Sequence, residues 1–252
     1  MNAIRSVIFN VFYIFGSFFW AFVLLWTFFF PPKKCTAIIS AVYGKYLMLI
    51  VRYIMGIRLD IKGMENLPKD GPYIIAAKHQ SALETLKIPF SKEFNYPVIV
   101  LKKELTRLPL WGLYPKFMGL VTVDRSLGME SLRAMTEGCK GALRDGRSIA
   151  IFPQGTRVKP GATVPYKAGL AKLYKDLGVP IVPMALNTGV LWGRNAFFKK
   201  AGTATLEFLP ALPAGLPPLK MMEQLEKIIE QESDRLVIAA GGPALKKEET
   251  AV

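Results

Sequence analysis

The chain has 252 residues, a formal net charge of +14 at pH 7, 51% hydrophobic residues, one histidine and two cysteines. This length allows one sizeable domain and an appendage. The positive charge calls for an anionic partner. Because no zinc spacing, basic helix or aromatic–glycine RNA motif occurs, we favour an anionic membrane surface over a nucleic acid. Two cysteines specify neither a disulfide framework nor a metal site.

The N-terminal segment is apolar. No charged residue occurs from residue 6 to residue 32, and residues 7–30 are almost all aromatic or aliphatic. A helix over 7–30 would be about 36 Å long, enough to cross the hydrocarbon core of a bilayer. The segment runs into two prolines and two lysines and shows no small-residue cleavage site, so we interpret it as a retained anchor. A buried core helix is less favoured, because Phe and Trp occur on all its sides.

A second apolar segment, residues 35–55, carries Lys45 and Arg52 on one helical face. This pattern is typical of a helix that lies in the membrane interface. Basic residues follow the first segment, so the positive-inside rule places the remaining chain on the cytoplasmic side of the inner membrane. We therefore expect residues 1–55 to form a membrane anchor, with a hairpin that dips into one leaflet as the alternative to a spanning helix.

From residue 56 the sequence changes to short apolar runs separated by Gly, Pro and Asp. Alternating strands and helices indicate an α/β domain over residues 56–240, with a mixed, largely parallel sheet flanked by helices. Residues 241–252 are expected to form a flexible polar tail. The predicted strands are 58–62, 73–78, 97–101, 120–123, 148–152, 181–186 and 203–208, and the predicted helices are 83–94, 129–144, 167–177 and 219–239.

His79 is the only histidine of the chain. It directly follows a predicted strand, and Glu84 comes five positions later, in the first turns of a predicted helix. A carboxylate beside an imidazole fixes the tautomer of the ring and stabilises the imidazolium that forms when the ring takes a proton. The spacing predicts a His–acid pair that activates a hydroxyl group. A purely structural histidine is the alternative that spacing alone leaves open.

Further candidates follow other predicted strands. The turn after 148–152 presents Thr156 and Arg157, and an arginine can hold a phosphate through two parallel hydrogen bonds. Ligands of α/β proteins bind at the carboxyl ends of the strands, so cations at several strand ends predict a shared anion site. Cations that follow two other strands are Lys102, Lys103 and Arg125.

The sequence also disfavours several enzyme classes. No Gly-x-Ser-x-Gly nucleophile elbow occurs, which disfavours an α/β-hydrolase. Neither a Walker phosphate loop nor a Gly-x-Gly-x-x-Gly fingerprint is present. With one histidine and no clustered cysteines, a zinc site is not expected.

Four motifs, taken in order, resemble those of the glycerolipid acyltransferase family, in particular the bacterial 1-acylglycerol-3-phosphate acyltransferases. The likeness covers roughly residues 50–210. It departs from the family pattern twice, with Glu84 where Asp is usual and Gln154 where Glu is usual. The motifs are His79-Gln80-Ser81-Ala82-Leu83-Glu84, then Lys102-Lys103-Glu104-Leu105 with Leu108 to Gly112 and Gly119 to Arg125, then Phe152-Pro153-Gln154-Gly155-Thr156-Arg157, and the apolar run 179–185.

The resemblance implies transfer of an acyl group from acyl-CoA or an acyl carrier protein to the sn-2 hydroxyl of 1-acylglycerol-3-phosphate, with no metal or bound cofactor. His79 is then the general base and Glu84 orients it. Another lysolipid, such as a lyso-ornithine lipid, is the alternative acceptor. A non-catalytic basic membrane-binding protein is less favoured, because the His79–Glu84 spacing is retained. The implied substrate-binding residues are Lys102, Lys103, Arg125, Gln154, Gly155, Thr156 and Arg157.

Overall fold

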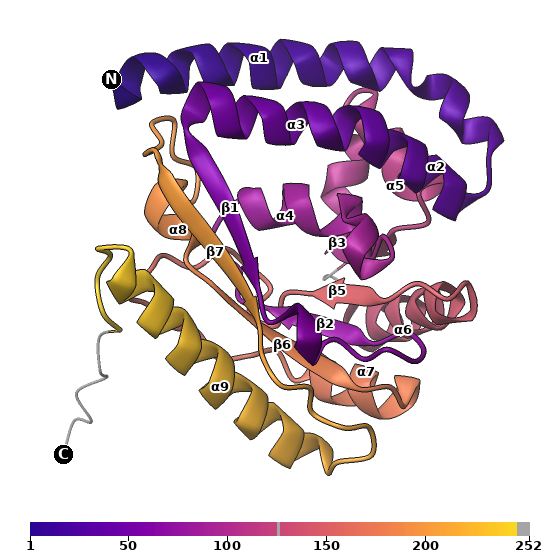
Figure 1. Cartoon of the computed structure of the whole chain (residues 1–252). Coiled ribbons are helices and arrows are strands. Elements are labelled where there is room, and N and C mark those ends of the chain that lie inside the picture. Colours follow the sequence, from indigo (N-terminus) through magenta and orange to yellow (C-terminus); the bar gives the residue numbers. More distant parts are fainter. Residues whose placement is uncertain (125–126, 246–252) are drawn as a thin grey trace.

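The computed structural model describes residues 1–124 and 127–245, and its centre is a sheet of seven strands flanked by helices (Figure 1). All seven predicted strands are present, so the predicted α/β architecture is confirmed. The strands are β1 Ile57–Lys62, β2 Ile74–Ala77, β3 Val98–Lys102, β4 Val121–Val123, β5 Ile149–Ile151, β6 Ile181–Leu186 and β7 Gly202–Phe208.

The sheet is mixed, with the order β1-β7-β6-β2-β5-β3-β4. Strands β6, β2, β5, β3 and β4 run parallel to one another, whereas β7 is antiparallel to β6 and parallel to β1. Five strands therefore end, and two strands begin, at the same edge of the sheet. We call this edge the His79 edge, because His79 follows the end of β2 there.

Both faces of the sheet are covered. Successive side chains of a strand point to opposite faces, and in β2 Ile74 and Ala76 pack on one side while Ile75 and Ala77 pack on the other. The first side is covered by α6 (Gly128–Arg144), α7 (Gly169–Leu177) and α9 (Pro218–Ala239), which lies along the sheet in Figure 1. The second side packs against the short helical segments that follow β2.

The helix predicted over 83–94 is interrupted. It consists of α4 (Leu83–Lys87) and two 3₁₀ turns, Ile88–Phe90 and Lys92–Phe94. Pro89 cannot donate the hydrogen bond that an α-helix needs at this point, and it ends the regular helix. Short elements that were not predicted are α5 (Tyr114–Phe117), α8 (Thr188–Leu191) and the 3₁₀ turns Met64–Asn66, Lys103–Arg107 and Trp111–Leu113.

The N-terminal region is an antiparallel helical hairpin (Figure 1). Its first arm is α1 (Asn2–Val23), and a 3₁₀ turn, Leu25–Phe29, leads to the second arm. Both arms are long and apolar enough to cross a membrane, judged by length and composition. The second arm runs from Pro32 to Met55 and comprises α2 (Pro32–Ile39), α3 (Lys45–Leu49) and two π-helical stretches, Ser40–Gly44 and Ile50–Met55.

The hairpin packs against the α/β domain along its length. Near the start of α1, the Lys199 backbone N–H donates to Ser6 Oγ at 2.9 Å. Near its end, Tyr114 Oη donates to the Ala21 carbonyl at 2.6 Å. The expected unbroken helix over 7–30 ends at Val23, and the chain then turns back along the first arm (Figure 1). Whether the arms span a bilayer or dip into one leaflet stays a prediction.

Gly56 joins the hairpin to the sheet. Its φ of +75° ends the second arm in the left-handed conformation, and a Cβ at this position would lie 2.7 Å from Arg5 Nη1. Strand β1 begins at the next residue, at the His79 edge. The reversed direction of β1 therefore places the hairpin over the edge of the sheet where His79 lies.

Candidate active site

The backbone of His79 is held on both sides. Its N–H donates to Gln154 Oε1 at 3.1 Å, and its carbonyl accepts from the Val158 N–H at 2.8 Å. The imidazole stacks on Phe152, with 4.2 Å between the ring centroids. Because Phe152, Gln154 and Val158 all belong to the loop after β5, this loop positions the histidine that follows β2.

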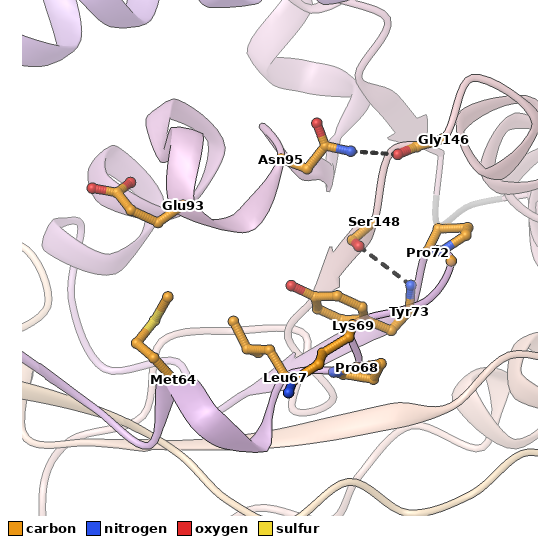
Figure 2. Close-up of a pocket in the computed structure, with 11 residues that line it drawn as sticks. Met64, Leu67, Pro68, Lys69, Pro72, Tyr73, Glu93, Asn95, Gly146 and Ser148 are labelled. Atoms are coloured by element: carbon orange, nitrogen blue, oxygen red, sulfur yellow. Dashed lines mark hydrogen bonds between the residues drawn. The ribbon is translucent and has the colours of Figure 1, made fainter.

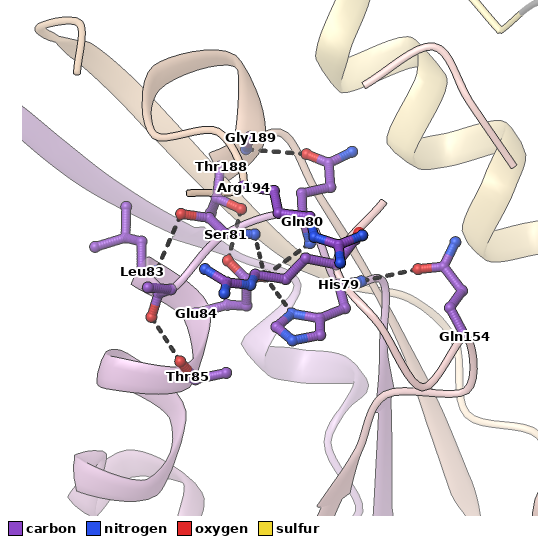
Figure 3. A network of polar contacts seen from close by, with 12 residues as sticks. His79, Gln80, Ser81, Leu83, Glu84, Thr85, Gln154, Thr188, Gly189 and Arg194 are labelled. Carbon is purple, nitrogen blue, oxygen red and sulfur yellow. Dashed lines mark hydrogen bonds and ion pairs between the residues drawn. The ribbon is translucent and has the colours of Figure 1, made fainter. Parts of the chain in front are cut away.

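Glu84 pairs with the imidazole, as Figure 3 shows. Its Oε1 lies 2.8 Å from His79 Nδ1 and also accepts from the backbone N–H groups of Gln80 and Ser81, at 2.8 and 2.7 Å. Its Oε2 accepts from Thr188 Oγ1 at 2.7 Å, and the side chain is fully buried. Four donors therefore fix the carboxylate. The longer Glu in place of the usual Asp still reaches the ring, because it begins from the first turn of α4.

This pairing assigns the two ring nitrogens. An acceptor-only carboxylate at Nδ1 selects the tautomer that carries its proton on Nδ1. Nε2 is then left with a lone pair, and the His79 side chain, 16% exposed, lines a large cavity. The arrangement can remove a proton from a group that enters this cavity.

The cavity measures about 1180 Å³ and is lined by both polar and apolar side chains, from the hairpin as well as from the domain. The polar walls are Ser81, Lys102, Thr156, Arg157 and Arg194, and apolar walls include Tyr13, Phe18, Tyr43, Leu86, Phe90, Leu105 and Trp111.

The predicted substrate-binding residues are not all in this cavity. Lys102, Gly155, Thr156 and Arg157 line it, whereas Lys103 does not and instead pairs with Asp124 at 3.3 Å. Arg125 lies outside the described residues.

Gln154 is placed differently from the expectation of a substrate contact. It is 1% exposed and points away from the cavity, because the chain turns at Gly155, whose φ is +68°. Its carbonyl accepts from His79, and its Nε2 donates to Glu230 Oε1 on α9 at 3.2 Å. The side chain therefore supports His79 from behind.

Four residues of the site were not predicted. Thr188 and Arg194 follow β6, and Arg194 Nη1 donates to the Arg157 carbonyl at 3.3 Å. The rule that strand ends carry functional residues could have found both, since β6 was predicted. Lys78 and Glu230 form a buried ion pair beneath His79, and no signal in the sequence connects them.

A second hollow, of about 470 Å³, lies at the other end of β2 (Figure 2). Tyr73 and Ser148 line it, as do Asn95 and Gly146. The two hydrogen bonds drawn in Figure 2, Tyr73 N–H to Ser148 Oγ and Asn95 Nδ2 to the Gly146 carbonyl, use polar groups of its wall for internal contacts. We therefore place the chemistry in the larger cavity, which contains His79.

A histidine backed by a buried carboxylate, on a cavity that both cations and apolar side chains line, is an arrangement that can act as a general base on an amphiphilic anionic substrate. The sequence model of the Acyltransferase family matches residues 58–187. The chain therefore belongs to the Acyltransferase family.

Two bacterial proteins are among its relatives. The chain is 29% identical over 219 residues to a 1-acyl-sn-glycerol-3-phosphate acyltransferase of Pseudomonas aeruginosa, covering 85% of this chain and 82% of the relative. It is 29% identical over 200 residues to the enzyme of the same name from Borreliella burgdorferi, covering 79% and 74%. Similarity extends to a human 1-acyl-sn-glycerol-3-phosphate acyltransferase alpha, of which the chain covers 62% at 28% identity.

The fold also occurs among solved structures. One of them is the 1-acyl-sn-glycerophosphate (LPA) acyltransferase PlsC from Thermotoga maritima, with a TM-score of 0.72 and 20% sequence identity. The match covers 94% of this chain and 98% of that chain. It therefore includes the N-terminal hairpin as well as the sheet.

Proposed function

We propose that this chain is an O-acyltransferase that moves a fatty acyl group from an acyl thioester to the sn-2 hydroxyl of 1-acylglycerol-3-phosphate, giving phosphatidate. The observation that carries the proposal is the His79–Glu84 pair at 2.8 Å, with Nε2 open on a cavity that Arg157 also lines. The names of the relatives, which are lysophosphatidate acyltransferases, support the same substrate class.

The chemistry follows from the ring tautomer. His79 Nε2 takes the proton of the acceptor hydroxyl while its oxygen attacks the thioester carbonyl, and Glu84 stabilises the imidazolium that forms. When the tetrahedral intermediate collapses, the carbon–sulfur bond breaks and the imidazolium returns the proton to the leaving thiolate. The acyl group passes directly to the acceptor. Because a thioester is already an activated acyl donor, we infer that the reaction needs no metal or bound cofactor.

The phosphate of the acceptor would bind to the cations that line the cavity. Arg157 and Arg194 lie in adjoining loops and both line the wall near His79, and Lys102 lines it from the end of β3. A guanidinium can hold a phosphate by two hydrogen bonds and thereby fix the distance from the phosphate to the hydroxyl. Fixing that geometry can supply about 7–11 kcal/mol of barrier reduction.

The apolar side chains of the cavity would bind the fatty acyl chain. Aromatic and aliphatic side chains from both the hairpin and the domain line the cavity, so a long acyl chain would be buried between them. The donor is acyl-CoA or an acylated carrier protein, and the excess of basic residues suits an acidic carrier.

The hairpin would hold the enzyme at an anionic membrane. Large apolar side chains on its outer surface recur every three or four residues along α1 and continue into the 3₁₀ turn that follows, which makes one exposed apolar surface. Basic residues flank the two arms, so we place the domain on the cytoplasmic side of the inner membrane. This surface includes Phe15 (71% exposed), Phe19 (60%) and Phe22 (69%) on α1, and Trp26 (50%) and Phe29 (90%) in the turn.

The test is thiol release by the purified protein in detergent, with acyl-CoA as donor and a panel of acceptors. We expect release that depends on lysophosphatidate and yields phosphatidate. Release with a lyso-ornithine lipid in preference to lysophosphatidate would transfer the assignment to that acceptor. If neither acyl-CoA nor acylated carrier protein reacts with any lysolipid, the chain is not an acyltransferase of this kind and the non-catalytic alternative holds.

A further inference from the structure

We propose that Gln154 and Glu230 form one positioning unit for His79, and that this unit requires one amide and one carboxylate between its two positions. Glu230 lies on α9, outside the region matched by the family model. The proposal rests on the proposed role of His79 as the base. Neither residue would touch substrate, so both act through the histidine.

The hydrogen bonds give the unit a direction. Gln154 Nε2 lies 3.2 Å from Glu230 Oε1, and Gln154 Oε1 lies 3.1 Å from the His79 backbone nitrogen. An ionised carboxylate can only accept hydrogen bonds, so Glu230 compels the amide to present its NH₂ group. The carbonyl of the same amide then faces His79. Glu230 thus determines how the backbone at the catalytic histidine is held.

The charges around Glu230 balance. Lys78, the residue before His79, pairs with Glu230 Oε2, and the two side chains are 2% and 11% exposed. Tyr166 Oη lies 3.0 Å from Glu230 Oε1, and burial together with the Glu230 charge raises the pKa of this phenol well above its usual range. Tyr166 is therefore a neutral donor. One ammonium and one carboxylate share a buried space to which Gln154 adds no charge.

A carboxylate at position 154 would upset this balance. Gln154→Glu places two carboxylates side by side with one ammonium, and such a pair retains a shared proton because both cannot ionise cheaply. Glu226, one turn earlier on α9, adds to the negative potential. The pKa of the Glu226 carboxyl group is raised, first by burial and second by the charge of Glu230. The pair in this variant would hold its proton at low pH and lose it as pH rises. The support of His79 should therefore fail on the alkaline side.

The reciprocal substitution, at Glu230, disturbs the unit for a different reason. Glu230→Gln leaves the ammonium of Lys78 buried without a counter-charge, which is costly. The double variant, Gln154→Glu with Glu230→Gln, restores one amide and one carboxylate in exchanged places. The amide introduced at position 230 can donate to the carboxylate introduced at position 154, whose other oxygen accepts from His79.

The single histidine of the chain makes the test direct. Protein carrying ¹⁵N-histidine and a histidine-free tag gives one backbone amide signal, that of His79. In detergent near neutral pH, we expect each single variant to shift this signal and to lower kcat about tenfold or more, and the double variant to recover most of both. Gln154→Glu should also lose activity as pH rises. Glu223→Gln removes an exposed carboxylate from the same helix and is the matched control, expected to change neither.

A double variant no more active than the weaker single variant would overturn the proposal, as would a wild-type pH profile for Gln154→Glu. If a single variant does not fold, Tyr166→Phe replaces it. This substitution leaves the charges of Lys78 and Glu230 unchanged and removes one hydrogen-bond donor to Glu230. If the His79 amide signal is not shifted in the Tyr166→Phe variant, that result also contradicts the proposal. Absence of acyl transfer by the wild type would remove the proposed function alone, because the amide signals still decide the positioning.

Discussion

Thr188 Oγ1 lies 2.7 Å from Oε2 of Glu84, although 104 residues separate the two along the chain. The contact joins the loop after β6 to the first turn of α4 and completes the set of four donors on the buried carboxylate. The His–Glu pair is therefore the product of two distant segments, even though its two members are neighbours in sequence.

Thr188→Val should lower kcat about tenfold, with little change in KM. The substitution keeps the shape of the side chain and removes a donor to a buried carboxylate, which costs about 1–3 kcal/mol. Steady-state thiol release measures the effect. Thr188→Ser keeps the hydroxyl and should retain most of the activity. Equal losses in both variants would show that packing, and not the hydrogen bond, matters here.

His79→Ala should reduce acyl transfer by about a hundred- to ten-thousand-fold, the usual contribution of a general base. Glu84→Gln should be nearly as damaging, because a neutral amide cannot stabilise the imidazolium by its charge, and its NH₂ group cannot accept the hydrogen bond that Thr188 Oγ1 donates to Glu84 Oε2. Sedimentation with vesicles should be unchanged in both variants. Substantial acyl transfer by the purified His79→Ala variant would contradict the proposed general-base mechanism.

Arg157→Ala and Arg194→Ala should each raise KM for lysophosphatidate about tenfold or more, while KM for the acyl donor changes little. The reason is the loss of a charged hydrogen-bond donor to the phosphate. Initial rates at varied acceptor concentration make the comparison. Arg133→Ala removes an exposed cation on α6, away from the cavity, and controls for net charge. If all three variants behave alike, the two arginines have no specific role.

Replacement of Phe15, Phe19 and Phe22 by Ser should weaken binding to anionic vesicles. Each buried aromatic side chain contributes about 1.5–3 kcal/mol to transfer from water. Activity on vesicle-borne acceptor should fall, while activity on a short-chain acceptor in detergent stays near the wild-type value. Vesicle flotation measures the binding. Undiminished flotation would place the membrane contact elsewhere on the protein.

The sequence predicted the parts of the site that are local in the chain. His79 and Glu84 are five residues apart and lie at the junction of a strand and a helix, so their spacing in the sequence is enough to predict that the two side chains meet. The strands could be predicted equally well, because their buried faces require apolar runs in the sequence. The prediction of one continuous helix over 83–94 was wrong, because Pro89 ends the regular helix. The proline was visible in the sequence, but the apolar pattern around it was given more weight.

The remaining parts depend on contacts between distant segments. Gln154 was expected to touch substrate, and its burial follows from Glu230, which lies 76 residues away on a helix whose docking no local pattern specifies. The docking of the hairpin on the domain was equally inaccessible, because apolar segments satisfy the same composition whether or not they pack against the rest of the chain. The contacts that join the two, such as those of Ser6 and Ala21, link residues that are distant in sequence.

The position of Glu230 on α9 has a consequence for the order of synthesis. The apolar hairpin precedes the α/β domain in the chain, and the carboxylate that fixes the support of His79 follows the histidine by most of the length of that domain. A growing chain can thus meet a lipid surface long before its histidine is held in place.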